Sequence, residues 1–501
     1  MKVRMMFCAW ALIFSFMAGS AWGATETSNQ TFLGLNAGLS DTGTDNTCIG
    51  QSAGRLNTGT FNTFLGDFTG YFNDGNNNAF VGYEAGYKNT TGSNNAFMGY
   101  FAGSQNTAGS YNTFIGGNAG KVNTGGDYNT FIGNQAGQSN LGGSYNTFIG
   151  YEAGGKNTVG NSNTFIGRDA GYSSTAASNN IFIGDYAGTS NSTGYDNNFI
   201  GKDAGHENAN GKANNFLGRN AGYANTSGAY NTFLGHEAGR SNSVASYNTF
   251  SGYTAGYSNT TGERNTFAGT SAGWSNTVGK YNTFLGYAAG WANTTGNYNT
   301  FFGYAAGYKN AAGSSNLYLG NYAGYENTTG VGNVFLGYNA GRNETGSGKL
   351  YIDNSSTATP LIYGDFSANT VTINGTLYAT VVTPSSREYK DNIQQLNAED
   401  AMKTLHGLQP VTFTYKTSPG ENHVGFIAED VPGLVAAKER KGVSSMDVVS
   451  VLTRVVQEQQ RGMQEQQKLI QEQQRIITAL SEKVALHERL LRTPRTMPNA
   501  D

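Results

Sequence analysis

Asn112-Thr113-Phe114-Ile115-Gly116 returns unchanged at Asn129-Thr130-Phe131-Ile132-Gly133, and variants of this phrase recur from Phe32 to Phe335. Counted from its middle residue, which we call the anchor, the first three steps are 16 residues long and every later step is 17, which gives nineteen units. A short fixed period is typical of a solenoid, in which each unit covers its neighbours. The sequence therefore predicts a β-solenoid over residues 24–349.

Small residues hold constant places within each unit. Gly stands two residues after every anchor and again six residues after it, and Ala precedes the second Gly in all units except at Thr69. Such glycines suit corners where φ is positive or where coils approach closely, and Ala is small enough to point inside. All seven prolines fall at or after Pro360, as expected if the backbone N–H groups of the array bond between coils.

Asn stands two residues before the anchor in every unit except the first, which has Gln30. Stacked Asn side chains can bond to one another along the axis of a β stack. We interpret the rest of the unit, such as Asn123-Thr124-Gly125-Gly126, as turn chemistry.

The anchor and the residue after it are both apolar, as in Phe114-Ile115 and Phe284-Leu285. Adjacent strand residues point to opposite faces, so only one of the two can fill the interior. This pattern favours association of parallel copies along the array, and a solvent-exposed apolar row is the alternative. At about 4.8 Å per coil, nineteen coils predict a rod of about 90 Å.

Charge and period limit the function classes. A net charge of −3 without a basic cluster in the array gives no signal for nucleic-acid binding. Charges such as Asp169, Lys202 and Glu237 stand at variable places, and the period admits no inserted loop that could gather them into a catalytic cluster. We expect no catalysis in the array and no cofactor or metal. Binding of surface glycans or of another cell surface by the Tyr and Asn rows is expected instead, with a passive spacer as the alternative.

Residues 1–23 have the pattern of a signal peptide, with Lys2 and Arg4 before an apolar run and small residues at a cleavage position. The run is short for a bilayer span, so removal is expected, with an uncleaved anchor as the alternative. The mature chain would be secreted or held at the cell surface without membrane insertion. Cys48 would then be its one cysteine, which excludes an intrachain disulfide.

Residues 350–384 predict a β neck without chemistry. Leu350-Tyr351-Ile352-Asp353 keeps the aromatic anchor but has Asp in the place of Gly, and later runs alternate as strands. Asn374-Gly375 between two such runs predicts a hairpin turn.

The repeated phrase resembles the head repeats of trimeric autotransporter adhesins. This resemblance implies a β-roll of three chains. The period is longer here than in that family, and the chain lacks the family's C-terminal membrane β-barrel.

Three blocks near the C-terminus, Ser385–Ile393, Leu408–Tyr415 and Val424–Val431, resemble the intramolecular chaperone domain of endosialidases and phage tail spikes, the S74 peptidase family. The resemblance implies a domain that trimerises, guides folding of the fibre ahead of it and cuts itself off. It assigns Ser385 as the nucleophile and Lys390 as the base, with cleavage between Pro384 and Ser385.

With these two residues the domain would act at most as a serine endopeptidase that cuts its own chain once. A hydroxyl needs a base, and lysine serves as one only where burial or positive neighbours lower its pKa. Arg387 could supply such a charge, whereas Glu388 could pair with Lys390 and keep it protonated. Ser386 and Glu388 also depart from the family's usual residues. An uncleaved trimerisation cap therefore stays open as the alternative.

Residues 449–492 predict a coiled coil, and residues 493–501 a disordered tail. Glu, Lys and Arg lie outside the seam, and three Gln layers inside it would set the register of a parallel homotrimer. The seam consists of Val449, Val456, Met463, Ile470, Ile477, Val484 and Leu491 at one heptad position, and of Leu452, Gln459, Gln466, Gln473, Leu480 and His487 at the other. The predicted fold is mainly β: a solenoid shaft, a β neck, a small α+β chaperone domain over residues 385–448 and a trimeric coiled coil.

Overall fold

The computed structural model describes residues 29–377, 386–416, 420 and 422–492. The chain divides into two compact units, Met1–Tyr378 and Ala379–Asp501. The predicted signal peptide over residues 1–23 and the predicted tail over residues 493–501 lie outside the described residues.

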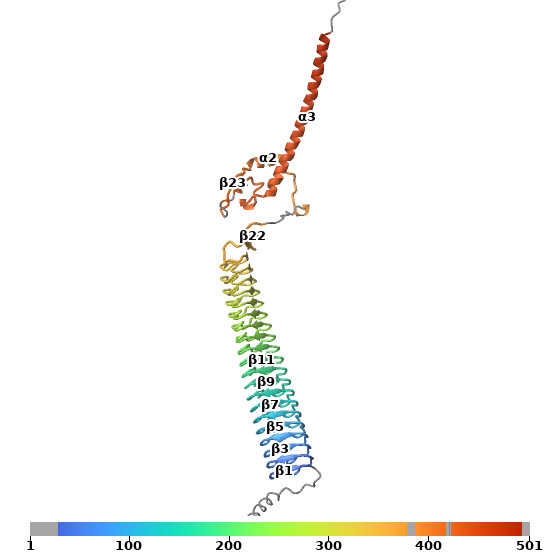
Figure 1. Cartoon of the computed structure of the whole chain (residues 1–501), viewed down its shortest axis with the longest axis vertical. Helices are drawn as coiled ribbons and strands as arrows, with labels where there is room; N and C mark the ends of the chain where they lie inside the picture. The colour runs from blue at the N-terminus through green and yellow to red at the C-terminus, as the bar shows by residue number, and fades with distance from the viewer. Residues whose placement is uncertain (1–28, 378–385, 417–419, 421, 493–501) are drawn as a thin grey trace, which may run out of the picture. The chain divides into compact units, whose positions relative to one another are not determined.

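The first unit contains a β-solenoid in which each turn adds one three-residue strand (Figure 1). Each strand from β1 to β19 pairs in parallel with the next, and the anchor residues face one another in register, as Phe148 faces Phe165. This confirms the predicted solenoid and its period. The strands are β1 (Thr31–Leu33), β2 (Thr47–Ile49), β3 (Thr63–Leu65), β4 (Ala79–Val81), β5 (Ala96–Met98), β6 (Thr113–Ile115), β7 (Thr130–Ile132), β8 (Thr147–Ile149), β9 (Thr164–Ile166), β10 (Ile181–Ile183), β11 (Asn198–Ile200), β12 (Asn215–Leu217), β13 (Thr232–Leu234), β14 (Thr249–Ser251), β15 (Thr266–Ala268), β16 (Thr283–Leu285), β17 (Thr300–Phe302), β18 (Leu317–Leu319) and β19 (Val334–Leu336).

The anchors form the core of the solenoid. The anchors from Phe64 to Phe335 are buried, whereas Phe32 of the first coil is only partly buried. Successive rings stack, with 4.8 Å between the ring centroids of Phe148 and Phe165. Cys48 takes the place of a ring in the second coil and is also fully buried. Because each ring is covered by the rings before and after it, the core is continuous along the shaft.

The two glycines of each unit are required for different reasons. Gly116 has φ +135°, and a Cβ there would lie 2.3 Å from the carbonyl oxygen of Gly133 in the next coil. Gly120 has φ +55°, and a Cβ there would lie 2.5 Å from the ring of Phe114. Close approach between coils explains the first glycine, and close approach to the core ring explains the second.

Two rows of buried asparagines join the coils, of which we predicted one. In the predicted row, two residues before the anchor, the Asn112 side chain bonds mainly to backbone: its Oδ1 accepts from the Asn129 N–H at 2.9 Å, and its Nδ2 donates to the Gly126 carbonyl at 2.8 Å. Part of this row also has the predicted bonds between side chains, as from Asn163 Nδ2 to Asn146 Oδ1 at 3.1 Å. A more continuous side-chain ladder lies in a second row, nine residues after the anchor, where Asn123 Nδ2 donates to Asn106 Oδ1 at 2.7 Å. We had interpreted that row as turn chemistry.

Two antiparallel strands follow the last parallel strand of the solenoid. Strand β20 (Lys349–Ile352) still pairs in parallel with β19, and β21 (Ile362–Asp365) and β22 (Thr370–Ile373) then add as antiparallel strands. The turn between β21 and β22 covers residues 366–369. The hairpin that we predicted at Asn374-Gly375 is therefore not found there, since Thr376 and Leu377 are not in a strand.

The second unit is a small α+β domain. Its elements are the 3-10 helix η1 (Arg387–Tyr389), helix α2 (Ala398–Gly407), the antiparallel pair β23 (Val411–Phe413) and β24 (His423–Gly425), the 3-10 helix η2 (Lys438–Arg440) and helix α3 (Ser445–Leu491). Asn397 caps α2, and Ser444 caps α3. Ala401 of α2, Val431, Val435, and Val451 and Val455 of α3 form the buried core.

Candidate functional site

The described part of the predicted cleavage site is a short exposed turn. Ser386 caps η1 by accepting a hydrogen bond from the Glu388 N–H at 3.3 Å, and Lys390 ends η1 with its backbone N–H donated to the Arg387 carbonyl. Residues 386–390 are all exposed in the single chain. Pro384 and Ser385 lie outside the described residues, so cleavage between them and the pairing of Ser385 with Lys390 stay predictions.

Helix α3 presents two different faces. Val451 and Val455 pack against α2 and are 1% and 2% exposed. The predicted seam residues beside them, Val449, Leu452 and Val456, are 41–57% exposed. From Gln459 to Arg492 every residue is exposed. The helix thus uses one face inside its own domain and leaves the heptad seam uncovered.

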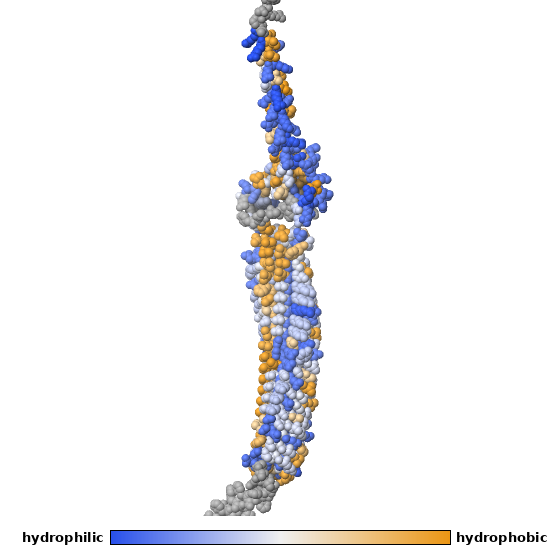
Figure 2. Space-filling view, turned by 90° about the vertical axis from the view of Figure 1, so that its right-hand side faces the viewer, coloured by the Kyte–Doolittle hydropathy of each residue, from blue (hydrophilic) through white to orange (hydrophobic). Residues whose placement is uncertain are grey.

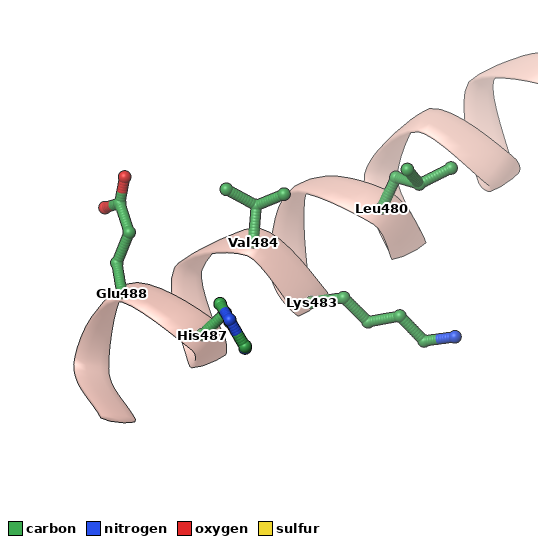
Figure 3. Close-up of a pocket in the computed structure, with 5 residues that line it drawn as sticks. All are labelled: Leu480, Lys483, Val484, His487 and Glu488. Carbon is green, nitrogen blue, oxygen red and sulfur yellow. The ribbon is translucent and has the colours of Figure 1, made fainter. Parts of the chain in front are cut away.

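The exposed seam forms one side of a shallow depression of about 340 Å³ near the end of α3 (Figure 3). Leu480, Val484 and His487 belong to the seam, and Lys483 and Glu488 flank it. All five side chains come from the one helix, so the depression has no opposite wall. An apolar strip flanked by charges is typical of a helix–helix contact in a coiled coil.

A family model, "Peptidase_S74: Chaperone of endosialidase", matches residues 385–437. The chain carries a C-terminal S74 chaperone-of-endosialidase domain. The match begins at Ser385, the predicted nucleophile, and includes Lys390. Helix α3 lies beyond the match, so its seam is a feature of this chain rather than part of the matched S74 domain. No significant match to the chain was found among curated proteins or solved structures, and the similarity to autotransporter heads stays a resemblance.

The shaft ahead of the S74 domain leaves a second apolar row uncovered. The residue after each anchor points away from the core, and members such as Met98, Leu217 and Phe302 are 41–52% exposed. Hydrophobic side chains accordingly follow one another along the solenoid (Figure 2). Ser251 is the one polar residue at this position of the nineteen coils. Extended exposed apolar surfaces are unusual for monomers and are often found at interaction sites.

The described residues offer neither a membrane-spanning helix nor a metal site. None of their helices is long and apolar enough to cross a bilayer. Nor do their His, Cys, Asp and Glu side chains form any group of three or more that could hold a metal ion.

Proposed function

We propose that the chain forms an exported homotrimeric fibre, that its shaft binds a surface glycan or another cell surface, and that its S74 domain assembles the trimer and then releases itself by cutting before Ser385. The single observation that carries the proposal is the exposed seam of α3 next to a domain of this family. Apolar heptads exposed over most of a helix need partner helices.

Assembly from the C-terminal end has a kinetic reason. Pairing of long parallel β structures between chains is slow, and a shift by one coil gives nearly the same contacts when every coil is alike. A coiled coil would bring three chain ends together in one register. The apolar row of each shaft would then meet the same row of its neighbours from the first coil that folds.

The binding role rests on the outer surface of the shaft. Tyrosines such as Tyr111, Tyr128 and Tyr145 stack in exposed rows, with 4.8 Å between the ring centroids of Tyr111 and Tyr128. Exposed tyrosines combine an apolar ring with a hydroxyl and are enriched at recognition surfaces. The alternative is a passive structural fibre that keeps its cap.

Self-cleavage is tested by comparing wild type, Ser385→Ala and Ser386→Ala on a denaturing gel. The proposal expects two fragments from wild type, full-length chain from Ser385→Ala, and two fragments from the neighbouring control Ser386→Ala. A single full-length band from wild type would favour the passive fibre with an uncleaved cap. Export and removal of residues 1–23 are tested by N-terminal sequencing of the secreted chain.

A further inference from the structure

Two ridges of aromatic residues run along the C-terminal part of the shaft. The first ridge contains Tyr287 and Tyr304, three residues after their anchors, with ring centroids 5.0 Å apart. In the second ridge, seven residues after the anchors, successive ring centroids lie 5.0–5.5 Å apart; its members are Tyr257, Trp274, Trp291, Tyr308 and Tyr325. Trp274 and Trp291 are the only tryptophans after residue 23.

A groove of about 290 Å³ lies between these ridges. Ala288 and Ala305 line it and are each 3% exposed, while Tyr287 and Tyr304 of the first ridge are 52% and 44% exposed. Since its lining residues come from successive coils, the groove follows the shaft axis. It is lined by Ser271, Tyr287, Ala288, Trp291, Tyr304, Ala305, Tyr308, Tyr322 and Tyr325.

The groove exists because one position of the unit becomes small in these coils. Four residues after the anchor, other coils carry larger side chains such as Tyr186, Asn220 and Glu237, whereas coils of the groove carry Ser271, Ala288 and Ala305. The small residues thus coincide with the densest part of the second ridge.

The backbone at this position does not favour alanine. Ala288 and Ala305 have φ +51° and +50°, a left-handed conformation that Asn and Asp tolerate better than Ala. Two successive alanines there oppose the local preference. The same position is left-handed in other coils too, as at Phe101 and Tyr186, so the groove coils differ in side-chain size rather than in backbone, and the small side chains keep the groove open.

The lining defines the chemistry of a ligand. None of the nine lining residues carries a charge, and the phenol hydroxyls, the Ser271 hydroxyl and the Trp291 indole N–H supply hydrogen-bond donors and acceptors. The rings of each ridge stack face to face along the shaft. Tyr322 is turned out of the stacks, at 63° to Tyr304.

We propose that this groove binds a neutral oligosaccharide lying along the shaft. Sugars present many hydroxyls together with apolar C–H surfaces, which suits an uncharged groove whose phenol, indole and Ser271 groups can hydrogen-bond hydroxyls and whose rings and alanines provide apolar contact. No lining residue is cationic, and two nearby cations already have partners: Lys309 pairs with Glu326 at 2.7 Å, and Arg342 donates to Asn339 and lies over the ring of Tyr322. The groove therefore favours a neutral ligand over a carboxylated or sulfated one. An extended peptide would need free backbone groups, whereas the shaft backbone here already bonds between coils, as Ala292 N–H does to the Tyr308 carbonyl at 2.9 Å. The assignment rests on the proposed binding role of the shaft and names its ligand class.

The test uses the secreted full chain and tryptophan fluorescence. Tetrasaccharides of glucose, mannose and N-acetylglucosamine are titrated as neutral probes, and a sialylated tetrasaccharide is the acidic probe. At least one neutral probe should give a saturable change in fluorescence, and the acidic probe should give none. Ala288→Asn should weaken binding at least tenfold, because it fills the groove with a residue that the left-handed backbone accepts and that Asn220 already provides at this position in another coil. Asp203→Asn, at the same position outside the groove, should bind as wild type does.

Tyr304→Ser is a second variant, which removes one wall without adding volume, and it should also lose binding. Thermal unfolding of each variant checks that the shaft is folded. If both Ala288→Asn and Tyr304→Ser still bind a neutral probe, the groove is not the binding site, although the shaft still binds a glycan. A shaft that adheres to cells but binds no neutral probe would contradict the assignment of the groove, but not the proposed binding role of the shaft. A shaft that neither adheres to cells nor binds any probe would overturn both the groove and the proposed binding role.

Discussion

Buried amides determine how individual residues hold the coils together. In most of the row nine residues after the anchor, the Asn Nδ2 donates to the Oδ1 of the Asn one coil before it, as Asn140 does to Asn123 at 2.6 Å. At the N-terminal end the row closes on Asp41, which accepts from Asn57 Nδ2 at 2.9 Å and needs no donor of its own. A carboxylate is suited to end a ladder that requires only an acceptor there.

The ladder is interrupted at Ser174, which replaces Asn. The Asn157 Oδ1 and the Ser174 hydroxyl are both buried without a hydrogen-bond partner in the described shaft. A buried polar group without a partner destabilises the fold. Ser174 is therefore a weak point in the stack, as is Asn310, whose side-chain Nδ2 and Oδ1 are also buried without a hydrogen-bond partner.

Ser174→Asn should stabilise the shaft. The new Nδ2 can donate to Asn157 Oδ1, and the new Oδ1 can accept from Asn191, so about 1 to 2 kcal/mol of added stability is expected at roughly 1 kcal/mol per hydrogen bond. Asn242 shows that the position accepts Asn where Ala follows three residues later, as Ala177 does after Ser174. The denaturant midpoint measures the change, with exposed Ala176→Asn as the control. An unchanged midpoint in Ser174→Asn would contradict the ladder model.

At the scale of elements, the shaft ends where parallel pairing changes to antiparallel pairing. The Lys349 ammonium on β20 donates to the Asp365 carboxylate on β21 at 2.6 Å. This bond, together with the Ser367 hydroxyl, holds the pKa of Asp365 well below its usual value. The ion pair thus joins the last coil to the first strand of the neck.

The lowered pKa predicts a pH dependence of stability. Ionised Asp365 stabilises the neck above the usual carboxyl pKa near 3.8, and this contribution is lost as the pH falls from there through the lower folded pKa. Asp365→Asn should therefore show a smaller loss of thermal stability between pH 4 and pH 2 than wild type. Asp196→Asn, at an exposed shaft position, serves as the control and should behave as wild type. Equal losses in wild type and Asp365→Asn would contradict the role of the ion pair.

At the scale of the whole molecule, both units leave a long apolar row uncovered in a single chain. One row follows the anchors of the shaft, and the other is the heptad seam of α3. Each row would be covered by the same row of a parallel copy, because identical repeats in one register bring equivalent residues together. In the proposed fibre, equivalent rows of the chains would therefore contact one another.

Disrupting the seam should lower the oligomeric state. Ile470→Asp places a charge in the seam, whereas Gln471→Asp places the same residue just outside it, and both are made in a Ser385→Ala background so that the module is retained. Native mass spectrometry should give three times the subunit mass for Gln471→Asp and a reduced trimer fraction for Ile470→Asp, because a buried charge without a partner is costly. Equal trimer fractions in the two variants would show that the seam does not direct assembly.

The period of the sequence determined the shaft almost completely. Each coil contacts only the coils beside it, so a repeat of 16 or 17 residues with a buried ring and two glycines leaves one way to stack. The blocks that begin at Ser385 similarly predicted the S74 domain, because its motifs are local in the chain.

The tertiary structure decided which side chains meet across coils. It placed a continuous amide ladder in the Asn123 row, beside the partial ladder in the row that the sequence suggested. It also turned Val451 and Val455 inward while leaving Val449 and Val456 exposed, and brought three positions of the unit together as the aromatic groove. Periodicity shows which residues are equivalent. The direction in which each row points depends on backbone angles within the coil, such as the left-handed turn at Ala288, and the pattern of residue types does not specify them.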